Sequence, residues 1–213
     1  FSPLKPRKPW HRFQHYYCWF FYGLMTLIWA TFKDFVAINR YQKLGLLKRM
    51  GKSYNELMTR IILAKVIYYP LVLGLPLMFS GLASGQIIAG WLLMHFVGGL
   101  ILALVFQPAH CMEDHDFVPA EKGAVMDVDP MSHVLNTTCN FGVNSKALLW
   151  YSGGLNHQIE HHLFPHICHV HYKDLAPIVK ETAKEFGLPY RDETSFMGAI
   201  RLHTAQLRQL GRA

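Results

Sequence analysis

IILAKVIYYPLVLGLPLMFSGLASGQIIAGWLLMHFVGGLILALVF, residues 61–106, holds two apolar runs on either side of a short uncharged turn. The runs Ile61–Phe79 and Ile87–Phe106 are each about 20 residues long, the length with which an α-helix crosses the hydrocarbon of a bilayer. Two prolines in the first run predict a kink, which membrane helices tolerate. We therefore predict a transmembrane helical hairpin whose turn lies at residues 80–86.

The composition of the whole chain fits a membrane protein. Of its 213 residues, 51% are hydrophobic and 16% are charged, against about 25% charged residues in an average soluble domain. The formal net charge is +7, but the basic residues flank apolar runs, as the positive-inside rule expects of cytoplasmic loops. This placement argues against nucleic acid as a partner. The flanking basic residues are Lys5, Arg7, Lys8, Arg12, Lys33, Arg40, Lys43, Lys48, Arg49, Lys52 and Arg60.

These charges also predict a topology. If the hairpin turn is external, residues 33–60 and everything after residue 107 are cytoplasmic. A third apolar run, Tyr16–Phe32, is short and follows basic residues, so we expect a re-entrant or interfacial helix there rather than a full span. Residues 33–60 place leucines among cations, as expected of a helix that lies on anionic lipid.

The chain changes character after the hairpin. A short acidic region comes first, and two helices are predicted further on, at residues 173–187 and 195–210, where apolar side chains recur at helical spacing and glycine follows. The four cysteines are scattered without a C-x-x-C pair, which favours free thiols in a reducing compartment.

The predicted fold class is all-α, in one domain with three parts. Residues 1–60 form an interfacial or re-entrant and basic segment, residues 61–106 an integral membrane hairpin, and residues 107–213 a cytoplasmic α-helical region that carries the candidate metal site.

That candidate site is GGLNHQIEHHLFPHICHVHY, residues 153–172, which holds six of the chain's thirteen histidines. If QIEHH is helical, Gln158, His161 and His162 can share one side of the helix. Adjacent His161 and His162 diverge by about 100°, so two neighbouring metal ions could each take one of them. Neutral imidazole is a good ligand for iron, zinc and copper.

The same stretch resembles the third histidine box of the membrane fatty acid desaturases. It is most similar to the front-end acyl desaturases, which carry Q-x-x-H-H where other members have H-x-x-H-H. The Q-x-x-H-H box followed by L-F-P is the specific part of the likeness. Supporting segments resemble, in the same order, those of bacterial members: HRFQHYY, the apolar hairpin, FQPAHCMED, NTTCNFGVNSKALLWYSGGLN and HYKDLAPIVKETAKEFGLPY.

The resemblance implies a non-heme di-iron centre, with two iron ions, that uses O₂ and two external electrons to insert a double bond into an acyl chain. By position, His161, His162 and His110 are expected to be metal ligands, and Gln158 takes the place of the box's first histidine. Removing hydrogen from an unactivated carbon needs an oxidant that no side chain supplies, so a metal fits the reaction. The residues expected to orient these ligands are Asn156, His157 and Glu160.

The resemblance also implies partners and a location. The expected substrate is a fatty acyl-CoA or an acyl-lipid, and the expected electron donor is a ferredoxin or a b-type cytochrome. We expect the chain in the bacterial inner (plasma) membrane, with its metal site on the cytoplasmic side. The basic residues 33–60 would suit the phosphate of CoA or an anionic headgroup. No substrate-binding residue and no double-bond position follow from the sequence.

One departure from the family is serious. Members carry two earlier boxes, H-x-x-x-H and H-x-x-H-H, which supply most of the ligands, and neither is present here. His11 and His15 have the spacing of the first box, but HRFQHYY resembles the segment after the second. The chain is therefore expected to be the C-terminal part of a desaturase with about half of the metal site, and its activity by itself is left open.

The remaining histidines receive other interpretations. His95 lies within a span and is expected to hydrogen-bond to a neighbouring helix, because a buried imidazole needs a partner. His203 is expected at the surface. Three further histidines match no ligand position: His115, His133 and His166.

Three alternatives stay open at this point. Another membrane di-iron oxidase, such as a hydroxylase or a ketolase, shares the logic of the histidine boxes. A zinc site or an inactive metal-binding membrane scaffold could use a different cluster. The ligands of that cluster would be His166, Cys168, His169 and His171. A truncated, inactive remnant is the third.

Overall fold

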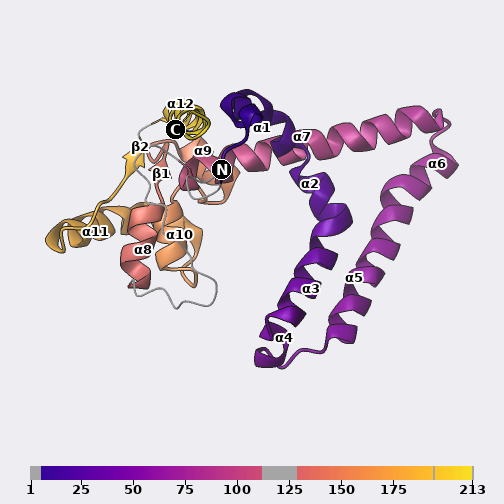
Figure 1. Ribbon diagram of the computed structural model, residues 1–213, viewed down its shortest axis with the longest axis horizontal. Coiled ribbons are helices and arrows are strands. Elements are labelled where there is room, and N and C mark those ends of the chain that lie inside the picture. Colours follow the sequence, from indigo (N-terminus) through magenta and orange to yellow (C-terminus); the bar gives the residue numbers. More distant parts are fainter. Residues whose placement is uncertain (1–5, 112–128, 194, 213) are drawn as a thin grey trace. The chain divides into compact units, whose positions relative to one another are not determined.

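The computed structural model describes residues 6–111, 129–193 and 195–212. The chain divides into a hairpin unit, residues 19–103, and a terminal unit, residues 1–18 with 104–213. Apart from two strands of two residues each, the regular structure of the described part is helical, which confirms the all-α prediction (Figure 1). The predicted acidic region lies largely outside the described residues, as do His115, Glu113, Asp114, Asp116, Glu121 and Asp127.

The hairpin unit contains the predicted membrane hairpin. Two helices are long and apolar enough to cross a membrane, Tyr54–Phe79 and Ser84–His110, and the turn between them is shorter than predicted because the second helix begins at Ser84. The prolines of the first helix do not end it. Instead it passes through a π-helical turn, the kind of local adjustment with which membrane helices accommodate proline. Its successive parts are α5 (Tyr54–Tyr69), η3 (Pro70–Gly74) and α6 (Leu75–Phe79), and the second helix is α7 (Ser84–His110).

A third apolar helix is broken. The helical segments Pro9–Gly23 and Met25–Lys43 meet at an angle of 51°, so the pair is a broken span or a re-entrant loop. The predicted re-entrant helix therefore stays a prediction. The parts of this pair are η1 (Pro9–Phe13), α1 (Gln14–Gly23), α2 (Met25–Ile28), the π-helical η2 (Trp29–Lys33) and α3 (Asp34–Lys43).

Polar side chains inside the hairpin unit are satisfied by one another. The Tyr68 hydroxyl and His95 Nε2 are 2.6 Å apart, and the indole N–H of Trp91 donates to Tyr68 at 3.0 Å. Thr26 donates to the His95 carbonyl at 2.6 Å, and its hydroxyl lies 3.2 Å from Nδ1 of the same imidazole. The prediction that His95 hydrogen-bonds to a neighbouring helix is confirmed.

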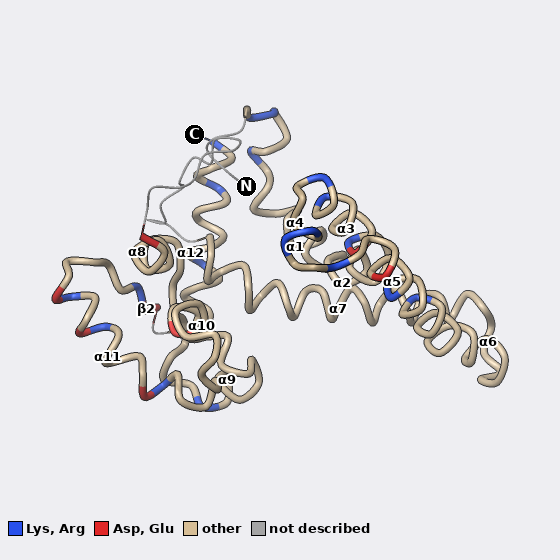
Figure 2. Tube along the Cα trace, turned by 90° about the horizontal axis from the view of Figure 1, so that it is seen from below, with Lys and Arg blue, Asp and Glu red and all other residues tan. Residues whose placement is uncertain are grey.

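Lysines and arginines of the hairpin unit lie on α3, on α4 (Leu46–Arg49) and on α5, whereas α6 and α7 carry neither residue type (Figure 2). Leu47 is buried while Leu44, Lys48 and Arg49 are exposed, and the predicted helix on the lipid surface stays a prediction. Lys65 lies within the apolar helix α5, and its ammonium forms an ion pair with Asp34 at 2.8 Å.

The terminal unit is a small helical assembly. Its two strands pair in parallel, with Asn140 opposite Asp192 and Phe141 opposite Glu193. The two helices predicted near the C-terminus are present. The elements after α7 are α8 (Pro130–Thr137), β1 (Asn140–Phe141), α9 (Lys146–Ser152), α10 (Gln158–Leu163), η4 (His169–His171), α11 (Tyr172–Glu185), β2 (Asp192–Glu193) and α12 (Phe196–Leu210).

Two small cores hold the terminal unit together. Phe141 and Ala199 are fully buried with the end of α7 around Val105, and Ile159 is fully buried against α8 and α11. Ser195 caps α12, since its hydroxyl accepts from the Gly198 amide at 2.8 Å. Through Ile159, α10, the helix of the histidine stretch, is anchored in the second core.

Candidate metal centre

His110 and His162 meet although 52 positions separate them in the chain. His110 is the last residue of α7, and His162 lies on α10. Their Nε2 atoms are 3.4 Å apart, and the ring planes are inclined by 69°. Two imidazole nitrogens that bind one ion at about 2.1 Å stand about 3.0 to 3.4 Å apart. The pair therefore fits two ligands of a single metal ion.

His161 takes a different direction from its neighbour. Its Nδ1 lies 3.4 Å from the hydroxyl of Tyr172, the first residue of α11. The ring centroids of His161 and His162 are 5.4 Å apart, so the two imidazoles diverge, as the helical spacing predicts. Tyr172 could orient His161, a role that sequence reasoning did not assign.

Gln158 is almost fully buried, at 1% exposure, at the start of α10. Its Nε2 has no hydrogen-bond partner in the described part of the chain. A buried amide without a partner costs free energy unless something satisfies it. No hydrogen bond joins Gln158 to His110, His161 or His162 among the described residues, so its role as a ligand stays a prediction.

His157 is also buried, at 1% exposure, and neither ring nitrogen has a hydrogen bond within the described residues. Its Nδ1 lies 3.7 Å from Glu160 Oε2, an ion-pair distance only if the imidazole is protonated. The role of Asn156 in orienting a ligand stays a prediction. The Asn156 amide reaches the Gly142 carbonyl at 3.5 Å, and its Oδ1 accepts from Ser152 at 3.3 Å.

Glu160 is held by two residues that are distant in sequence. Tyr190 donates to Oε1 at 2.8 Å, and the Asn140 amide donates to Oε2 at 2.7 Å. Asn140 also accepts from the Ile159 amide at 2.9 Å, and so fixes the first turn of α10. Sequence reasoning missed Asn140 and Tyr190. An asparagine directly before Phe141, in the segment TTCNFG, was the signal that could have found the first.

Burial and neighbouring charge set the protonation of the site. Burial, with the neighbouring His110 and His161, lowers the pKa of His162, so its imidazole is neutral at neutral pH, the form that binds metal. Burial, followed by the Glu160 carboxylate, raises the pKa of Tyr190, so the phenol stays a donor.

The described residues contain no group of three or more His, Cys, Asp or Glu side chains arranged to hold a metal ion. This also applies to the cluster proposed for a zinc scaffold. His166, His169 and His171 are exposed, and the Cys168 sulfur lies 4.0 Å from His169 Nδ1. All four cysteines are free thiols, as predicted.

The expectation for His203 was wrong. This residue is fully buried on α12, and its Nδ1 lies 2.7 Å from the Cys111 carbonyl. The packing of α12 against the end of α7, where Ala199 meets Val105 and Ala109, covers this face of the helix.

Comparison with known proteins gives a consistent result. The family model described as "Fatty acid desaturase" matches residues 1–194. Relatives include "sn-1 linoleoyl-lipid 6-desaturase" of Synechocystis sp., 30% identical over 100% of this chain and 58% of that protein. "Acyl-lipid (8-3)-desaturase" of Physcomitrium patens is 35% identical over 99% of this chain and 43% of its own length. No solved structure matches. The chain spans about half the length of the curated relatives it matches.

Proposed function

The chain belongs to the fatty acid desaturase family, and on that premise we propose that it takes part in inserting a double bond into the acyl chain of a lipid at an iron centre. The observation that carries this proposal is the meeting of His110 and His162, whose Nε2 atoms are 3.4 Å apart at the end of an apolar helix long enough to span a membrane.

We propose two iron ions, with His110 and His162 as ligands of one and His161 directed to the other. Iron, with O₂ and two external electrons, supplies the oxidising power that side chains lack. Gln158 offers a neutral amide to the site. Glu160, held by Asn140 and Tyr190, keeps α10 in place so that its histidines face the metal.

Two imidazoles do not complete the coordination of an iron ion. The proposed centre therefore needs more ligands than the described residues bring together. Full burial of His157 and its unpartnered ring nitrogens make it a further candidate beside Gln158.

The proposed substrate is an acyl-lipid, because relatives at 30% and 35% identity are named for lipid-linked acyl chains. We propose a ferredoxin or a b-type cytochrome as the electron donor. We place the metal centre on the cytoplasmic side of a plasma membrane, the side on which basic loops are retained. That the chain lies in a membrane rests on its family and its two spans.

Ligand substitution tests the proposal. In cells that express the complete gene product, His110→Ala and His162→Ala should each abolish double-bond formation and lower the iron bound by the purified protein. His166→Ala is the matched control, because this histidine is exposed and lies outside the pair. Normal unsaturated product from His162→Ala would contradict the ligand assignment, and hydroxylated acyl products from the wild type would point to the hydroxylase alternative instead.

A further inference from the structure

A second site is formed by the two ends of the chain, by residues outside the histidine box. We infer that the two ends of the chain form a groove that binds the phosphate of an anionic lipid headgroup. Two adjoining cavities of about 490 and 590 Å³ make up this basic groove, and they share His15, Tyr16 and Arg212. The cations that line it are Arg7, Lys8, Arg12, Arg201, Arg208 and Arg212.

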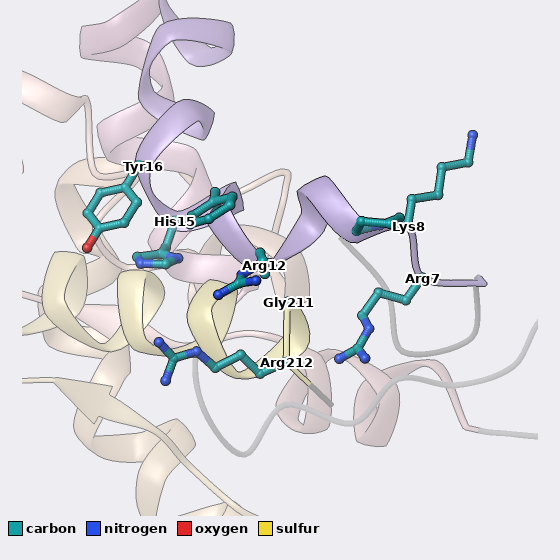
Figure 3. A pocket seen from close by; sticks show the side chains of 9 residues that line it. Arg7, Lys8, Arg12, His15, Tyr16, Gly211 and Arg212 are labelled. Carbon is teal, nitrogen blue, oxygen red and sulfur yellow. The ribbon is translucent and has the colours of Figure 1, made fainter.

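The groove is built by the packing of the start of α1 on α12. The buried Gln14 side chain donates to the Leu207 carbonyl at 2.7 Å. Gly211 lies directly on the His11 carbonyl, so that a Cβ at position 211 would collide with that backbone. Figure 3 shows the result, with Arg7 and Arg12 from the N-terminal segment and Arg212 from the turn after α12 around one pocket.

The charge of the groove is not compensated within the described part of the chain. None of its six cations forms an ion pair with a described carboxylate, and no aspartate or glutamate lines either cavity. Like charges held close together repel, and they create a positive potential that attracts an anion. The acidic residues of the segment 112–128 lie outside the described residues.

Arginine points to a phosphate as the anion. A guanidinium offers several N–H donors in a planar fork that matches phosphate oxygens. Five of the six cations are arginines, contributed by two segments far apart in sequence. A phosphate between Arg12 and Arg212 would be held from both sides, and it would relieve the repulsion between them.

Aromatic side chains beside the arginines favour a lipid over a free phosphate. Trp10, Phe13 and Tyr16 are 56%, 51% and 70% exposed on the same N-terminal segment. Large exposed aromatic rings are typical of the membrane–water interface, where one end of the ring contacts acyl chains and the other meets headgroups. The combination of exposed rings and unpaired arginines therefore fits an anionic phospholipid. The inference does not depend on the metal centre.

Binding of soluble short-chain lipids to the whole chain in neutral detergent tests this inference. Isothermal titration calorimetry should show saturable binding of dihexanoyl phosphatidylglycerol, with clearly weaker binding of the zwitterionic dihexanoyl phosphatidylcholine and of inorganic phosphate. The double variant Arg12→Gln/Arg212→Gln should weaken phosphatidylglycerol binding about 30-fold, since each cation near an anionic lipid contributes about fivefold.

Lys173→Gln/Lys184→Gln is the matched control, because it removes the same charge from exposed positions of α11. It should leave binding within about twofold of the wild type. Equal losses in both double variants would show a general charge effect and overturn the groove. Phosphate bound as tightly as phosphatidylglycerol would overturn the lipid assignment. If the double variant of the groove melts at a lower temperature than the wild type, two single variants, Arg208→Gln and Arg212→Gln, replace it. Each should weaken phosphatidylglycerol binding. Unchanged binding in both would refute the site.

Discussion

Glu160 illustrates how much of this protein depends on single buried polar residues. It is fully buried on α10, yet both carboxylate oxygens accept hydrogen bonds, from Tyr190 and from Asn140. A buried charge is tolerated only when its hydrogen-bonding capacity is satisfied. Gln158 and His157 are equally buried one helical turn or less away, but their nitrogens have no such partner among the described residues. Glu160 is therefore a structural carboxylate, whereas the ring nitrogens of His157 lack such a partner in the described part of the chain. The amide nitrogen of Gln158 is a donor and does not itself bind a metal.

The first prediction concerns Gln158. A glutamine carbonyl is a neutral and weak donor, so we expect it to tune one iron rather than hold it alone. Gln158→His keeps a donor at the same place and should retain part of the activity, whereas Gln158→Ala removes it and should cost about 10- to 100-fold. Double-bond formation, measured in cells that express the complete gene product, should decrease in the order wild type, Gln158→His, Gln158→Ala. An alanine variant as active as the wild type would make His157 the better candidate.

The second prediction concerns pH and His203. Burial lowers the pKa of His203, although the hydrogen bond to the Cys111 carbonyl opposes the shift. Below about pH 6.5 the unfolded chain therefore binds a proton that the folded chain resists, and the free energy of unfolding should fall as the pH drops. Above that pH both states are neutral and the contribution is fully present.

Thermal unfolding at pH 7.5 and at pH 5.5 measures this effect. His203→Gln keeps a donor toward the Cys111 carbonyl but does not titrate, so the melting temperature of this variant should change less between the two pH values than that of the wild type. His166→Gln, at an exposed position, should behave as the wild type does. Equal pH dependence in all three proteins would rule out His203 as the cause.

At the scale of the element, the hairpin unit shows how membrane helices approach one another. A Cβ at Gly99 of α7 would collide with the backbone carbonyl of Gly23 at the end of α1. Small residues permit such close approach, and helices in a bilayer associate largely through van der Waals packing and hydrogen bonds. The hydrogen bonds among Thr26, Tyr68 and His95 add a polar contact to the same packing.

The third prediction is that Gly99→Val destabilises the hairpin unit by about 1–3 kcal/mol, the usual range for overpacking. Gly90→Val on the same helix is the control, because a Cβ at Gly90 would meet no atom within 4 Å. Thermal melting in detergent compares the two variants. A melting temperature for Gly99→Val no lower than that of Gly90→Val would show that the close approach of these helices does not contribute to stability.

At the scale of the whole molecule, the question is which side of the membrane each part faces. The helix Ser84–His110 is long enough to cross, so its two ends are expected on opposite sides. The turn between the two spans is uncharged, while basic residues lie before the first span and after the second. Basic segments are retained on the cytoplasmic side. On these grounds we predict that the turn lies outside and the histidine box inside.

The fourth prediction tests that arrangement with thiol reagents that cannot cross the membrane. Cys168 is exposed, whereas Cys18, Cys111 and Cys139 are buried, so this chain offers one exposed thiol among its four cysteines. In intact cells Ala83→Cys should be labelled at position 83 and Cys168 should not. After the membrane is opened, both should react. Labelling of Cys168 in intact cells would reverse or remove the predicted topology.

The sequence by itself determined the membrane hairpin, the helical fold and the family. Each of these depends on patterns local to the chain: apolar runs of a fixed length, helical spacing of apolar side chains in α11 and α12, and the Q-x-x-H-H box on α10. Local patterns are readable because helix geometry repeats every few residues and the hydrocarbon has a set thickness.

The tertiary structure alone decided which distant residues meet. His110 reaches His162, Asn140 and Tyr190 converge on Glu160, and the arginines of the two chain ends line one groove. His203 became a core residue for the same reason, since the packing of α12 rather than its sequence decides which face is covered. Contacts of this kind depend on how elements pack, and packing is set by the shapes of partners that no single segment encodes.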